Sequence, residues 1–106
     1  MQLSEIENDI IYQSILNRIH NCINKDEMIQ KHARRLMELL NTIESKVSFT
    51  QLEKREVYDI YTSICIEQLH SDGEELILLE QLDSKFVTYI QDKFNPEFIP
   101  LSKRGE

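Results

Sequence analysis

Apolar residues recur along the chain at intervals of three and four, the spacing that gathers side chains on one face of a helix rather than the alternation of a strand. The pattern is plain in residues 11–23, where it uses Ile11, Ile15, Ile19 and Ile23. It returns in three later segments. The sequence therefore predicts four amphipathic helices and no β-sheet, at residues 4–23, 25–46, 50–70 and 74–94.

Helix-start signals accompany each of these segments. The first three starts are capping boxes, in which a capping side chain and a residue three positions later bond each other's backbone N–H groups. These boxes are Ser4 with Glu7, Asn24 with Glu27, and the overlapping pairs Ser48 with Gln51 and Thr50 with Glu53. The fourth helix is expected to be capped by Ser71 or Asp72. It should stop at Asn95, because a residue before proline is pushed away from helical dihedrals.

Four helices of similar length joined by short connections favour an all-α fold, an antiparallel four-helix bundle with a short C-terminal tail. We assign residues 1–95 to the bundle domain and residues 96–106 to the tail. The expected core takes apolar positions from all four stripes. It comprises Ile15, Ile19, Leu36, Leu40, Ile43, Val57, Ile60, Ile64, Leu79, Leu82 and Phe86.

Composition agrees with a single helical domain. The chain has 106 residues, enough for one hydrophobic core. With 41% apolar residues and only two glycines and two prolines, it is too apolar for disorder and too poor in turn formers for an all-β fold. The net charge of -7 disfavours direct binding of a phosphate backbone. A basic or neutral protein partner fits this charge better.

The chain carries no visible export signal, because acidic residues occupy the first positions, where a signal peptide needs basic ones. The longest aliphatic run, residues 76–79, is far too short to cross a bilayer. Cys22 and Cys65 are distant in sequence and form no CxxC pair, so we expect free thiols and a cytoplasmic location. The Ile- and Lys-rich composition would suit a bacterium or a phage.

Glu67 and His70 have the Glu-x-x-His spacing that di-metal helical bundles use. On a helical wheel, however, His70 falls about 140° from Val57, on the polar face. A bundle site also needs a second such pair, and neither His20 nor His32 has a glutamate three positions before it. We therefore expect no metal and no cofactor, with Glu67 and His70 exposed to solvent.

Catalytic motifs are absent from the sequence. The two glycines, Gly73 and Gly105, form neither a nucleophile elbow nor a phosphate-binding loop. His32 lies in the apolar stripe of the second helix, where a histidine is usually a hydrogen-bonded core residue. A pH-sensitive role for His32 is the alternative. We expect no catalytic residues and no enzymatic activity.

Several apolar residues are left over once the core is assigned. Ile10, Ile66 and Ile77 lie off the stripes of their helices, and the tail contributes Phe98, Ile99 and Leu101. Clustered exposed apolar groups mark interaction surfaces. These six residues are the predicted partner-binding set, with the fourth helix and the tail as the main surface. The alternative is that the tail folds back and covers part of the excess.

These patterns favour a small, non-enzymatic regulator that binds another protein, such as an inhibitor, an antitoxin, an immunity-type protein or an adaptor. Two alternatives remain. One is an acidic mimic of nucleic acid that blocks a nucleic-acid-binding protein, which requires acids on one face at duplex-like spacing. The other is a homodimer that assembles a metal site from two copies.

Overall fold

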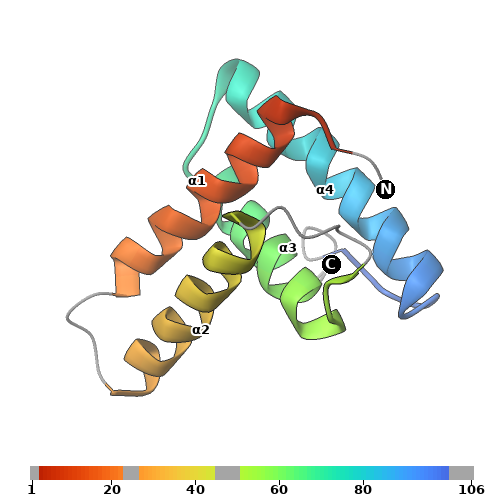
Figure 1. The fold of residues 1–106 in the computed structure, drawn as a ribbon. Helices are drawn as coiled ribbons and strands as arrows, with labels where there is room; N and C mark the ends of the chain where they lie inside the picture. Colours follow the sequence, from red (N-terminus) through yellow and green to blue (C-terminus); the bar gives the residue numbers. More distant parts are fainter. Residues whose placement is uncertain (1–2, 23–26, 45–50, 101–106) are drawn as a thin grey trace.

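Four helices make up the fold of this chain in the computed structural model, which describes residues 3–22, 27–44 and 51–100. The helices are α1 (Glu5–Cys22), α2 (Glu27–Glu44), α3 (Lys54–Gln68) and α4 (Gly73–Lys93). Figure 1 shows their arrangement. The described residues contain no strand. The predicted all-α class and the number of helices are therefore confirmed.

The helix starts agree with the sequence at one place and differ at another. At α1 the box is formed: the Glu7 N–H donates to Ser4 Oγ at 3.2 Å, and the Ser4 N–H donates to Glu7 Oε1 at 3.0 Å. At α3 the predicted start near residue 50 is too early. The helix begins at Lys54, with Glu53 as the cap and the Glu53 N–H donating to Glu56 Oε1 at 2.9 Å.

The remaining capping predictions have different outcomes. Asn24, Ser48 and Thr50 lie outside the described residues. Asp72 occupies the cap position of α4, as predicted, but its side chain makes no capping hydrogen bond. Gly73 follows it with φ of +59°, a backbone conformation that a side chain would strain. The glycine, rather than a capping bond, allows the chain to turn into α4.

The helices form two pairs in which the chain turns back on itself (Figure 1). The α1–α2 and α3–α4 pairs have the most extensive contacts, and α1 also packs along α3. Contact between α1 and α4 is sparse, and in Figure 1 these two helices diverge from one end of the molecule. Near that end, Lys85 Nζ lies 2.7 Å from Glu7 Oε2. One ion pair therefore joins the start of α1 to the middle of α4.

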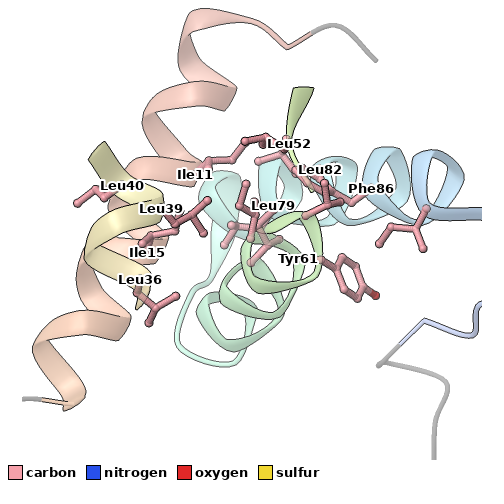
Figure 2. Close-up of a cluster of buried hydrophobic side chains, with 14 of the residues drawn as sticks. Ile11, Ile15, Leu36, Leu39, Leu40, Leu52, Tyr61, Leu79, Leu82 and Phe86 are labelled. Atoms are coloured by element: carbon pink, nitrogen blue, oxygen red, sulfur yellow. The ribbon is translucent and has the colours of Figure 1, made fainter. Parts of the chain in front are cut away.

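One continuous core lies among the helices. Figure 2 shows side chains of α1, α2 and α4 converging around α3. Ten of the predicted core residues are buried, and Ile43 is half-buried against the same cluster. Among the described residues, seven further buried apolar ones complete the core beyond that expected set, and these are Ile11, Ala33, Leu39, Leu52, Tyr61, Ile90 and Phe98. Leu52 and Phe98 lie outside the helices, where a stripe gives no guidance.

The end of α4 folds into a compact turn. The Phe94 and Asn95 N–H groups both donate to the Ile90 carbonyl oxygen, at 2.9 and 2.8 Å. Asn95 then accepts twice, from the Glu97 N–H through Oδ1 and from the Phe98 N–H through its carbonyl oxygen, each at 3.1 Å. This turn reverses the chain directly after the helix. The predicted stop at Asn95 is correct to within two residues.

Candidate functional site

The tail is held against α3 by an aromatic cluster. Phe98 is only 5% exposed, and its ring makes edge-to-face contacts with Tyr58 and Tyr61, with ring centroids 5.5 Å apart in each pair. Gln91 Nε2 donates to the Phe98 carbonyl oxygen at 3.0 Å. Each such ring pair contributes about 0.5–1.5 kcal/mol beyond simple burial. Phe98 therefore serves the fold, and its ring is not offered to a partner.

The other predicted partner-binding residues are divided between the core and the surface. Ile10 is half-buried and packs on the core, so the prediction that it lies off the buried face of α1 is wrong. Ile77 and Ile99 are 54% and 56% exposed. Ile66 is half-buried, and Leu101 lies outside the described residues. Partner binding by these residues stays a prediction, for which Ile66, Ile77 and Ile99 are placed suitably.

An apolar groove runs between α3 and α4 and includes Ile66. Its volume is about 410 Å³, within the range of about 300–1,000 Å³ that is usual for ligand pockets. The lining residues come from successive turns of the two helices and from the residue that ends α3. They are Thr62, Cys65, Ile66, Gln68, Leu69, Leu76 and Asp83. We call this set the α3–α4 groove.

Local sequence explains why the groove is apolar. Thr62, Ile66 and Leu69 recur at helical spacing on one side of α3, next to the buried stripe that contains Ile60 and Ile64. The helix ends at Gln68, and Leu69 follows as its C-cap with 81% of its surface exposed. A large apolar side chain is thus left in solvent at the mouth of the groove. On α4 the groove is bordered by Leu76.

Asp83 is the charged residue of the groove. Its Oδ1 accepts from the Tyr61 hydroxyl at 3.2 Å, and its Oδ2 accepts from Gln68 Nε2 at 2.8 Å. Cys65 Sγ lies 3.9 Å from Oδ2 as a weak donor. All three donors are neutral. Among the described residues no lysine or arginine reaches Asp83, since the ion pairs there are Arg35 with Asp59 and Lys85 with Glu7.

The groove continues past Asp83 into a second, more polar hollow of about 480 Å³. Gln68 and Asp83 line both cavities. The α4 residues that line the two cavities include Leu76, Glu80, Asp83 and Val87. They recur every three or four positions and therefore lie on one face of the helix. The polar hollow is lined by Gln68, Glu80, Asp83, Ser84, Val87, Thr88 and Pro100. An occupant of the full groove would meet apolar groups at one end and carboxylates at the other.

A second constellation joins α1, α2 and α3 through polar side chains. Arg35 Nη2 donates to Asp59 Oδ1 at 3.1 Å and to His32 Nδ1 at 2.9 Å, and Arg35 Nε lies 3.0 Å from Asp59 Oδ2. From α1, Arg18 donates to the Asp59 carbonyl oxygen and to Ser63 Oγ, at 3.3 and 3.2 Å. Asp59 and Ser63 are buried. We call these five residues the three-helix polar junction.

The junction fixes the charge state of His32. Because a guanidinium has only donors, the bond from Arg35 requires Nδ1 to be unprotonated. Burial and the charges of Arg18 and Arg35 lower the pKa of His32, against a smaller opposing effect of Asp59. His32 is therefore neutral with its proton on Nε2, a buried atom that has no hydrogen-bond partner among the described residues. The sequence predicted a hydrogen-bonded core histidine, whereas His32 is half-buried and only its Nδ1 has a partner among the described residues.

Glu67 and His70 point to different surroundings. His70 is exposed, as predicted. Glu67 is half-buried rather than exposed as predicted, and Asn17 Nδ2 of α1 donates to both of its carboxylate oxygens, at 3.3 and 3.2 Å. Within the described part of the chain, no group of three or more His, Cys, Asp or Glu side chains is placed to hold a metal ion. Glu67 therefore acts as a link between α3 and α1.

Asp83 and Leu69 belong to no motif in the sequence, although the distribution of charge along the chain marks their region. Between Arg55 and Lys85 there is no lysine or arginine, whereas eight of the 19 acidic residues fall there. These eight are Glu56, Asp59, Glu67, Asp72, Glu74, Glu75, Glu80 and Asp83. A charge profile along the chain would have marked α3 and α4 as the acidic half.

None of the helices, within the residues described, combines the length and the apolar character that crossing a membrane requires. Comparison of the chain with protein families, with curated proteins and with solved structures finds no match.

Proposed function

We propose that this chain is a small cytoplasmic, non-enzymatic regulator that binds another protein through the α3–α4 groove. The observation that supports this most directly is Leu69, a large apolar side chain that is 81% exposed beside an apolar cavity. Exposed apolar groups next to a concave surface are typical of protein interaction sites. Ile77, the residue after Leu76 on α4, is 54% exposed but does not line the groove.

The arrangement of polar and apolar side chains favours binding of a partner over catalysis. The polar groups that converge most closely, those of the three-helix polar junction, are engaged with one another across three helices. They stabilise the packing of the helices. The groove, in contrast, has apolar walls and one carboxylate, which is a combination suited to holding a side chain of another molecule.

A nucleic-acid mimic is the second candidate, because the acidic residues are gathered in one half of the chain. A mimic of phosphates needs carboxylates in regular rows. Here Asp83 faces an apolar cavity, and Glu67 is bonded to Asn17. The combination of apolar cavity and acidic rim favours a protein segment that carries apolar side chains of its own.

The test begins with identification of a partner by affinity purification from the source cells, followed by titration of the purified pair by calorimetry. We expect Leu69→Asp to weaken binding by at least about tenfold, since it places a charge at the mouth of an apolar cavity. Met37→Asp is the matched control, because Met37 is 52% exposed on α2, away from the groove.

Circular dichroism should show both variants folded, because both side chains are largely in solvent. A partner that binds the Leu69→Asp variant as tightly as the parent chain would show that the interface lies elsewhere. Equal weakening by Met37→Asp would likewise contradict the assignment to α3 and α4.

A further inference from the structure

The charge around the groove has one sign. No lysine or arginine stands between Arg55 and Lys85, so α3 beyond its first turn and the first half of α4 carry only acidic charges. Asp72, Glu74, Glu75 and Glu80 are exposed around the groove's end of the molecule. Like charges at this density raise the local concentration of cations and attract basic segments. An occupant that matches this field is basic.

Asp83 gives that field a specific point of contact. It is half-buried, and its hydrogen bonds come from the neutral groups of Tyr61, Gln68 and Cys65. No lysine or arginine among the described residues pairs with this carboxylate, which lines both hollows of the groove. A lysine or arginine that reached it would form a charge-assisted hydrogen bond, which is roughly twice as strong as a neutral one.

The groove has the dimensions of a helix-binding site. Its floor on α4 extends from Leu76 to Val87, which at 1.5 Å per residue is about 16 Å, or three turns of a docked helix. The apolar lining surrounds Ile66 and Leu76, and the carboxylates of Glu80 and Asp83 follow one and two turns along α4. The apolar part of the groove would accommodate the apolar face of an amphipathic helix. A basic residue further along that helix would then lie beside the carboxylates.

We propose that the α3–α4 groove binds an amphipathic helix of another protein, with its apolar side chains against Ile66 and Leu76 and a lysine or arginine on Asp83. This inference rests on the proposed function and specifies its partner. It predicts both components of recognition: apolar contacts that provide affinity, and one ion pair that fixes direction and excludes acidic segments.

A second copy of the chain is the competing occupant. The outer face of α2 has Lys31, Arg34 and Met37 exposed, which is a basic and partly apolar surface. Such a contact would be heterologous and would lead to rings or open chains rather than to a closed dimer. A single exposed methionine supplies little apolar area for a pocket of about 410 Å³, so we favour a separate protein.

The probe is a fluorescein-labelled synthetic helical peptide of about 14 residues, built from leucine, lysine and alanine with leucines at helical spacing. Two comparison peptides replace its lysines by glutamate, or keep its composition and scramble its order. We expect the basic amphipathic peptide to raise the fluorescence anisotropy with the full chain and to shift the NMR signals of Ile66, Leu69 and Leu76. The other two peptides should bind at least about tenfold more weakly.

Asp83→Asn tests the ion pair, because the amide keeps an acceptor for Tyr61 and removes the charge. We expect this substitution to weaken binding of the basic peptide about tenfold and to leave binding of the glutamate peptide unchanged. Asp92→Asn is the matched control, an exposed acid of α4 that lines neither cavity. Thermal unfolding of both variants checks that the fold is intact.

Three results would overturn the inference. If the glutamate peptide or the scrambled peptide bound as tightly as the basic amphipathic peptide, the groove would not be selective for a basic amphipathic helix. If the Asp83→Asn variant bound the basic peptide with unchanged affinity, the proposed ion pair with Asp83 would be contradicted. Sedimentation that shows self-association of the parent chain and its loss in Arg34→Glu would assign the groove to a second copy. The first two results leave the Leu69→Asp test of partner binding untouched, so this inference can fail while the proposed function stands, whereas the third would contradict both.

Discussion

His32 is kept neutral by the side chains packed around it, and this makes the stability of the chain depend on pH. Burial and the neighbouring Arg18 and Arg35 lower its pKa in the folded state, while the unfolded value is about 6.5. At pH values below 6.5 the unfolded chain therefore binds a proton that the folded chain lacks. Stability is complete above this pH and falls as the solution is acidified, by at most about 1.4 kcal/mol per pH unit from this group.

Urea unfolding at pH 8, 7, 6 and 5 measures this dependence. We expect the His32→Gln variant to be less pH-dependent between pH 7 and pH 5 than the parent chain. His70→Gln is the control, because His70 is exposed, and it should retain the full dependence. The range stops at pH 5 so that it stays above the titration of Glu7, whose pKa burial raises but the bonds from Lys85 and Ser4 lower overall. A parent chain whose stability rises on acidification in this range would contradict the assignment.

Leu36 and Met37 are neighbours on α2 with opposite surroundings. Leu36 is fully buried in the shared core, and Met37 is 52% exposed. Leu36→Ala should reduce the free energy of unfolding by about 2–5 kcal/mol, because it removes buried methyl groups and leaves a cavity. Met37→Ala should stay within about 0.5 kcal/mol of the parent. Chemical denaturation of the two variants gives the comparison, and similar losses would mean that the buried face of α2 has been misassigned.

At the scale of the elements, the tail belongs to the fold. Phe98 joins α3 through two tyrosine rings, so deletion of residues 97–106 would remove a core side chain together with any interface. We expect Phe98→Ala to cost about 3–5 kcal/mol of stability and Ile99→Ala, at an exposed position, less than about 0.5 kcal/mol. Thermal and urea unfolding of both variants measure the difference. Loss of less than about 1 kcal/mol in Phe98→Ala would show that the tail contributes little to the core.

The elements also show what local sequence can and cannot specify. The capping box of Ser4 and Glu7 forms as expected, because its partners lie only three residues apart, although Glu7 also binds Lys85 of α4. The start of α3 was placed too early, since several residues before Lys54 could serve as a cap and periodicity does not choose among them. Ile10 was predicted to lie off the buried face of α1, and for Phe98 the sequence left open whether the tail binds a partner or folds back. Their burial depends on which helix or turn lies opposite, and a single-helix pattern does not contain that information.

The candidate site was predictable only in part, for the same reason. Ile66 and Ile77 both lie off the main stripes, but only Ile66 lines the α3–α4 groove, and Ile77 is exposed on α4. Leu69 lies within the segment that the sequence assigned to the third helix, but the helix stops one residue earlier and leaves this side chain in solvent. Asp83 gains its role from Tyr61 and Gln68, which are 22 and 15 residues away in sequence. Such pairings arise only when α3 and α4 pack together.

At the scale of the whole molecule, charge is distributed unevenly. The net charge is -7, and residues 56–84 contain eight acids without a lysine or arginine. Two like charges about 10 Å apart in water repel by about 0.4 kcal/mol, and salt screens this repulsion over a few ångströms at high concentration. The two ion pairs among the described residues, Arg35 with Asp59 and Lys85 with Glu7, are weakened by the same screening. Repulsion should dominate because the acids outnumber the cations that face them.

We therefore expect sodium chloride to stabilise the free protein, with the free energy of unfolding rising by about 1 kcal/mol and the Tm by roughly 4–8 °C between low salt and 0.5 M. Glu80→Lys should raise the Tm at low salt and reduce the response to salt, because it places a cation within the acidic half. Glu38→Lys makes the same change of net charge on α2, four residues after Arg34, and should give no such gain. Calorimetric scans of the three proteins across the salt series measure both effects.

A Tm that falls with salt would show that the ion pairs outweigh the repulsion. Equal responses of the two variants would show that total charge, and not its concentration on α3 and α4, sets the stability. The same acidic field that costs stability in the free chain is the one that we expect a basic helix to neutralise on binding, so the salt that stabilises the free protein should weaken its complex.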